Sequence, residues 1–91
     1  MYKITASDVR DVVDGHGVSA LVQRDGVAVA STNPAFKDHD QSNLLITQED
    51  ARDMVRDDEW NEEGNITDSG AQRIADELNA DENIWRRMLD Y

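Results

Sequence analysis

The sequence predicts an α+β fold in which a small antiparallel sheet, made of a β-hairpin and a short third strand, is packed by an N-terminal helix and two to three C-terminal helices. Three observations predict it: a capped apolar segment that ends at glycines, an Asp-Gly pair between two β-prone runs, and apolar residues at helical spacing near the C-terminus. With 91 residues, the chain has room for a single domain, residues 1–91, with one two-layer core.

The first helix is expected at residues 7–14. Thr5 and Ser7 are both suitable N-cap residues, and valines at helical spacing give the segment one apolar face. Gly15 and Gly17 then end it, because glycine tolerates the backbone conformations that stop a helix.

A β-hairpin follows, with its turn at Asp25-Gly26. Asp-Gly between two β-prone runs is a strong hairpin signal, because a two-residue type I′ turn needs positive φ at both central residues. The turn predicts the register, pairing Val22 with Val29 and Leu21 with Ala30. Both faces of the hairpin are then mildly apolar, as in strands covered on each side.

The middle of the chain is expected to form a loop at residues 33–43, a short third strand at residues 44–46 and then a second helix. Thr47 is the N-cap of this helix, with Asp50 in the acidic position of a capping box. Further along, from Thr67, apolar residues recur with spacings of three, four and seven. This C-terminal pattern fits one long helix or two helices that meet near residues 79–81.

The outer face of the second helix is expected to be acidic. Glu49, Asp53 and Asp57 follow one another at i, i+4 and i+8, which places their carboxylates on one side of a helix. Trp60 falls opposite the apolar stripe. Either the helix frays or bends near Asp58, or the indole is exposed for a partner.

The net charge excludes several classes of protein. The chain holds 20 Asp and Glu against nine Lys and Arg, a formal net charge of −11, whereas a direct nucleic-acid binder needs a basic surface for the phosphates. No stretch approaches the ~20 apolar residues of a membrane span and the N-terminus lacks signal-peptide features, so we expect a cytoplasmic protein without membrane contact. The absence of Cys excludes disulfides, thiolate zinc sites and thiol nucleophiles.

The charge is concentrated in one half of the chain. Residues 1–37 hold four acidic and four basic residues, and residues 38–91 therefore carry the whole net charge of −11. Residues 49–68 alone hold nine acidic and two basic residues, a net charge of −7. Repulsion among negative charges at this density destabilises a small fold. Binding to a partner is therefore a reason for the protein to retain this concentration of charge. The alternative is a solvated acidic face kept for solubility.

No pattern in the sequence predicts catalysis or a cofactor. The two histidines, His16 and His39, stand in polar turns, and the sequence has no glycine-rich phosphate loop, so we expect no enzymatic activity and no catalytic residue. A calcium loop is the stronger of two metal hypotheses; the weaker is a transition metal bound by His39 between two aspartates.

That loop would draw its ligands from Asp38, Asp40, Ser42 and Glu49, at positions 1, 3, 5 and 12 of an EF-hand pattern. Asn43 replaces the glycine expected at position 6, so the preferred interpretation is an acidic surface loop without metal, and calcium binding stays open.

The sequence favours a non-enzymatic protein that binds a basic surface. An acidic helix and loop can occupy the Lys/Arg groove of a nucleic-acid-binding protein, because carboxylates at i and i+4 are spaced much as backbone phosphates are. Trp60 is either an anchor for this partner or a packing residue. The candidate partner-binding residues are Glu49, Asp50, Asp53, Asp57, Asp58, Glu59, Trp60, Glu62 and Glu63.

In size and charge the chain resembles the anti-CRISPR and anti-restriction proteins of phages. The resemblance implies an inhibitor or nucleic-acid mimic that acts in the host cytoplasm on a nucleic-acid-handling target. Two alternatives remain open. One is a halophile's domain, since 14 Asp, six Glu and only two Lys fit a surface suited to high salt. The other is a self-assembling subunit that pairs through the hairpin edge or the C-terminal helix.

Overall fold

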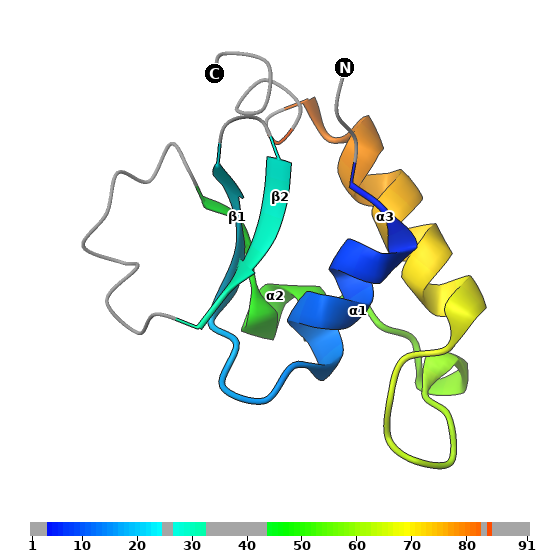
Figure 1. Ribbon diagram of the computed structural model, residues 1–91. Helices are drawn as coiled ribbons and strands as arrows, with labels where there is room; N and C mark the ends of the chain where they lie inside the picture. The colour runs from blue at the N-terminus through cyan, green and yellow to red at the C-terminus, as the bar shows by residue number, and fades with distance from the viewer. Residues whose placement is uncertain (1–3, 25–26, 33–43, 83, 85–91) are drawn as a thin grey trace.

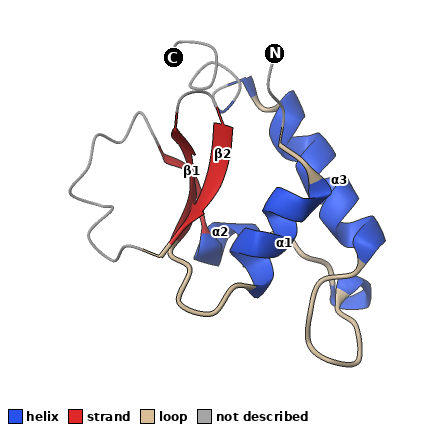
Figure 2. Cartoon of the chain, viewed as in Figure 1, coloured by secondary structure: helices blue, strands red, loops and turns tan. Residues whose placement is uncertain are grey.

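The structure is a three-stranded antiparallel sheet with helices packed on it, which confirms the predicted α+β class (Figures 1 and 2). The computed structural model describes residues 4–24, 27–32, 44–82 and 84. The elements, in chain order, are α1 (Ala6–Asp14), β1 (Ala20–Arg24), β2 (Val27–Ser31), β3 (Leu44–Thr47), α2 (Gln48–Asp53), the 3₁₀ helix η3 (Asp57–Glu59) and α3 (Asp68–Ala80). Within the described ranges, no helix has the length and apolar content needed to span a membrane.

Threonines cap the three α-helices α1, α2 and α3 of the described residues. The hydroxyls of Thr5, Thr47 and Thr67 accept hydrogen bonds from the backbone N–H three residues ahead, at 3.2, 3.1 and 3.2 Å. Each bond satisfies one of the N–H groups that have no partner within the first turn of a helix. Of the two candidate caps for α1, Thr5 is the one used, so Ser7 lies inside the helix.

The sheet has the strand order β2-β1-β3, and its hairpin has the predicted register. Val22 pairs with Val29 and Leu21 with Ala30. The expectation that both faces of the hairpin are covered is wrong for β2. Val27 and Val29 remain 44% and 37% exposed, although Ala28 between them is buried, so only one face of β2 packs on the core.

The core lies where α1 packs against the sheet on one side and against α3 on the other (Figure 1). The largest side chains that are buried almost completely there are Ile4, Val9, Val12, Val13, Leu21 and Ile74. The N-terminal segment is tied to α3 as well, since the Asn79 side chain accepts from the Ile4 N–H and donates to the Ile4 carbonyl, both at 2.8 Å.

Two side chains of α2 satisfy the last carbonyls of α1. Gln48 Nε2 donates to the carbonyls of Val12 and Gly15, at 2.9 and 2.8 Å. Arg52 Nε donates to the carbonyl of Val13 at 3.0 Å, which also places a positive charge at the negative end of the α1 dipole. The C-terminus of α1 is therefore capped from α2.

We expect Gln48→Ala to lower the free energy of unfolding by about 1–2 kcal/mol, because two half-buried carbonyls lose their donor. Urea denaturation followed by circular dichroism measures the change. Glu49→Ala, at the exposed neighbouring position, is the control and should cost less than about 0.5 kcal/mol. Equal losses in the two variants would contradict the capping role.

The second helix is shorter than predicted, so the expectation that Glu49, Asp53 and Asp57 share one helical face is wrong. α2 ends at Asp53, and Asp57 opens the separate helix η3. Just beyond this end, the Met54 carbonyl accepts a hydrogen bond from Arg73 of α3 at 2.7 Å.

The C-terminal helical pattern is interrupted where the sequence allowed a break. α3 ends at Ala80, and Asp81 is its C-cap residue. Trp85 and Met88, which the pattern also included, lie outside the described residues.

Candidate partner-binding site

The nine candidate residues come from α2, from η3 and from the turn that follows it. Seven carboxylates among them are exposed, and the structure shows none of the seven in an ion pair with a described residue. We call these seven the acidic surface: Glu49, Asp50, Asp53, Asp57, Asp58, Glu62 and Glu63.

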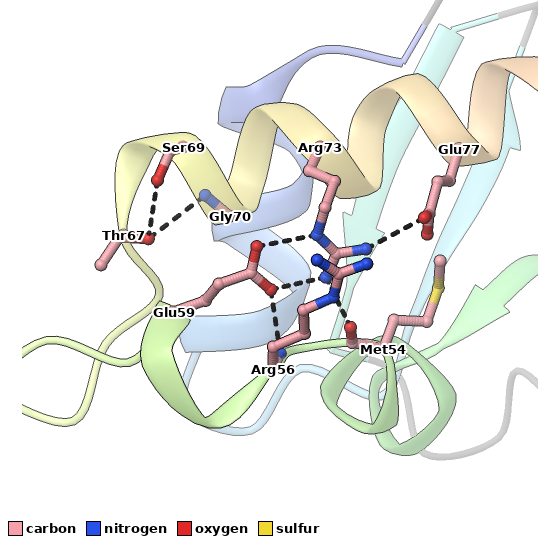
Figure 3. A network of polar contacts seen from close by, with 8 residues as sticks. All are labelled: Met54, Arg56, Glu59, Thr67, Ser69, Gly70, Arg73 and Glu77. Atoms are coloured by element: carbon pink, nitrogen blue, oxygen red, sulfur yellow. Dashed lines mark hydrogen bonds and ion pairs between the residues drawn. The ribbon is translucent and has the colours of Figure 1, made fainter.

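Glu59 differs from the other candidates because its carboxylate is turned inward and fully partnered (Figure 3). Its side chain is 12% exposed, and Arg73 donates to both oxygens, from Nη2 to Oε1 at 2.5 Å and from Nε to Oε2 at 2.7 Å. The backbone N–H of Arg56 also donates to Oε1, at 2.9 Å. These donors favour the ionised form. The hydrogen bonds from Arg73, and after them the one from Arg56, lower the pKa of Glu59 to about 2.

Arg73 holds the segment around η3 against α3. Besides Glu59, its guanidinium contacts the Met54 carbonyl at 2.7 Å and the Glu77 carboxylate at 3.0 Å (Figure 3). The interaction with Glu59 raises the pKa of Arg73 above its ordinary value. Sequence reasoning gave Arg73 no role, because its main partners lie 14 and 19 positions earlier and no local pattern connects them.

A glycine lets these two elements approach. A Cβ at Gly70 would lie 2.9 Å from the Glu59 Cβ, closer than side chains normally come. The Thr67 N–H also donates to the Glu59 carbonyl, at 2.7 Å. Glu59 is therefore a structural residue that fixes the acidic surface to the domain, and we no longer count it among the groups offered to a partner.

Trp60 is partly packed and partly open, so each of the two interpretations of this residue describes part of its environment. The half-buried indole packs against the core, and its backbone forms an isolated β-bridge with Ile66. The ring also lines a surface hollow of about 430 Å³. Arg52, His16 and Glu63 lie around the same hollow, so it mixes both signs of charge with an aromatic wall.

A second hollow, of about 400 Å³, lies between β3 and the C-terminal end of α3. Apolar side chains that include Leu45 and Leu78 form its floor. Three exposed carboxylates line it as well, those of Asp50, Glu77 and Asp81. Glu77 and Asp81 were not among the predicted site residues, because only the tertiary fold brings α3 beside α2 and β3.

The described residues hold no group of three or more His, Asp and Glu side chains that could bind a metal ion. Of the calcium-loop residues, Glu49 is exposed on α2, whereas Asp38, Asp40 and Ser42 lie outside the described residues. His39 lies outside them too, and His16 is exposed in the turn after α1.

Comparisons with protein-family models, with curated proteins and with solved structures found no match to this chain. The functional argument therefore depends on the geometry and charge of the chain itself.

Proposed function

We propose that this protein is a small, non-enzymatic inhibitor whose acidic surface occupies the basic groove of a nucleic-acid-handling protein or complex. The supporting observation is that seven exposed carboxylates, within 15 residues of chain, form no ion pair with the described residues. The surface hollow that Trp60 and Glu63 line also offers a partner an aromatic side chain next to these carboxylates. The target and the complex are cytoplasmic in this proposal, within the host cell if a phage encodes the chain.

The arginines around the acidic surface support the proposal, because several of them are committed to contacts within the fold. Arg52 caps α1, Arg73 holds Glu59, and Arg10 pairs with Asp68. Arg10 and Arg73 pair with Asp68 and Glu59, which are not part of the acidic surface, whereas Arg52 binds an uncharged carbonyl and keeps its positive charge beside Asp53. A dense field of one sign accelerates association with a basic partner and makes binding sensitive to salt.

The shape of the acidic surface differs from a single helical row of carboxylates. Glu49 and Asp53 are one turn apart on α2, about 6 Å at the Cβ atoms. Asp57 and Asp58 continue the charge from η3, and Glu62 and Glu63 from the following turn. The charge thus follows a bent path, and we propose that this path mimics backbone phosphates along a groove.

The binding test is a pull-down from bacterial lysate with the protein as bait, washed with rising salt. We expect a nucleic-acid-binding complex that is retained at low salt and eluted as salt increases. The double variant Asp53→Lys, Asp57→Lys should retain less than about a tenth of the target, because both exposed positions lie at the centre of the acidic surface.

The matched control is Asp11→Lys, Asp76→Lys, which changes the net charge equally at exposed positions on α1 and α3. This control should retain the target, and circular dichroism should show both variants folded. If both double variants lost the same amount of retained target, net charge alone would explain the binding, and the mimicry proposal would be overturned. An empty bait, together with a melting temperature that rises steeply in molar KCl, would support the halophile alternative instead.

A further inference from the structure

The outermost strand of the hairpin carries the exposed apolar side chains of the described structure. Val27 and Val29 are the large hydrophobic residues more than a third exposed there, and both belong to β2. No described strand lies beyond β2 in the sheet order β2-β1-β3. Apolar side chains gathered on an edge strand are a surface that monomeric proteins usually avoid.

This edge also lacks the usual features that prevent strand pairing. Residues 27–31 contain no charged residue and no proline, and β2 pairs with β1 in continuous register without a bulge. A hollow of about 500 Å³ lies between the end of this strand and α1, lined by Ala30 and Thr32 and by Arg10 and Asp11.

The distribution of charge indicates which occupant fits. The first 37 residues, which contain β2, have a net charge of zero, whereas the rest of the chain carries −11. A basic partner is attracted to the acidic half and has no electrostatic reason to bind at β2. Two copies of this chain, in contrast, can meet at β2 without bringing charged side chains of residues 27–31 against one another.

We propose that two copies of the chain associate through antiparallel pairing of their β2 strands about a two-fold axis. Such an interface is self-complementary, because each copy offers the same edge and the same two valines. The pairing joins two three-stranded sheets into one and shields Val27 and Val29 from water. The proposal does not depend on the identity of any target of the acidic surface.

Sedimentation equilibrium over a range of protein concentrations, at about 0.5 M salt to screen the acidic halves, measures the association directly. We expect a monomer–dimer equilibrium. The variant Val27→Lys, Val29→Lys should raise the dimer dissociation constant at least about tenfold, because it places four positive charges in the interface. The exposure of both valines means that these changes should not unfold the monomer.

The control Gln72→Lys, Ala80→Lys adds the same charge at exposed positions on α3 and should leave the dissociation constant unchanged. Amide hydrogen exchange distinguishes edge pairing from other modes, since β2 amides should exchange more slowly above the dissociation constant than below it. A wild-type protein that stays monomeric at millimolar concentration would overturn the proposal. So would a dimer that both variants weaken equally, or one without added protection in β2.

Discussion

Ile74→Ala is expected to lower the free energy of unfolding by about 3 kcal/mol, which corresponds to roughly 12–24 °C in melting temperature for a domain of this size. Ile74 is completely buried on α3, within the cluster that also contains Val9 and Val12 of α1. Removing three methyl or methylene groups there leaves a cavity between two helices that cannot close without shifting. Total stabilities in this size range are about 5–14 kcal/mol, so the loss is a large fraction of the whole.

Thermal and urea unfolding, followed by circular dichroism, measure this effect. Ile46→Ala makes the same chemical change at a partly exposed position of β3 and is the matched control. It should cost less than half as much, because solvent already reaches part of that side chain. If the two substitutions cost the same, the packing of α1 on α3 would not be the main source of stability.

The second large effect is the pH dependence contributed by Glu59. Its pKa is about 2 in the folded protein, below the ordinary carboxyl value of 4.5, so ionised Glu59 stabilises the native state above about pH 4.5. This stabilisation declines as pH falls from about 4.5 toward about 2. The variant Glu59→Gln lacks the titrating charge. It should therefore be clearly less stable than the wild type at pH 7, and the difference should shrink across that acidic window.

Urea midpoints of both proteins at intervals between pH 7 and pH 2 test this expectation. Using the difference between the two proteins removes the contribution of the many exposed carboxylates that they share. Glu62→Gln removes the same charge from an exposed position that has no ion pair with a described residue, and it should leave the midpoint close to the wild type at pH 7. A Glu59→Gln midpoint that differs from the wild type by a constant amount at every pH would contradict the role of the Arg73 pair.

The features predicted from sequence are those governed by neighbouring residues. Thr5 and Thr47 cap helices as predicted, because a threonine hydroxyl reaches an N–H only three positions away. The register of the hairpin, with Val22 opposite Val29, agrees with the pairing predicted from the sequence, while the predicted turn at Asp25-Gly26 lies outside the described residues. Helix caps and hairpin register can be predicted without knowing how the rest of the molecule folds, and both predictions are confirmed.

The errors concern residues whose environment depends on distant segments. Glu59 looked like one more exposed acid among acids, but Arg73 of α3 draws its carboxylate inward. α2 ends at Asp53, which separates Asp57 from Glu49 and Asp53, and the same arginine binds the Met54 carbonyl just beyond that end. The apolar residues on both faces of β2 likewise do not indicate whether both faces of the sheet are covered. In the structure one face is not, and Val27 and Val29 are exposed.

The sequence by itself determined the α+β class, the helix caps, the hairpin register and the concentration of negative charge in residues 49–63, because each follows from composition or from contacts within a few residues. Only the tertiary structure decided which acids face solvent, where α2 ends and which face of β2 stays uncovered. These properties depend on pairs such as Glu59 and Arg73, whose meeting is a consequence of how α3 packs and has no signature in local spacing.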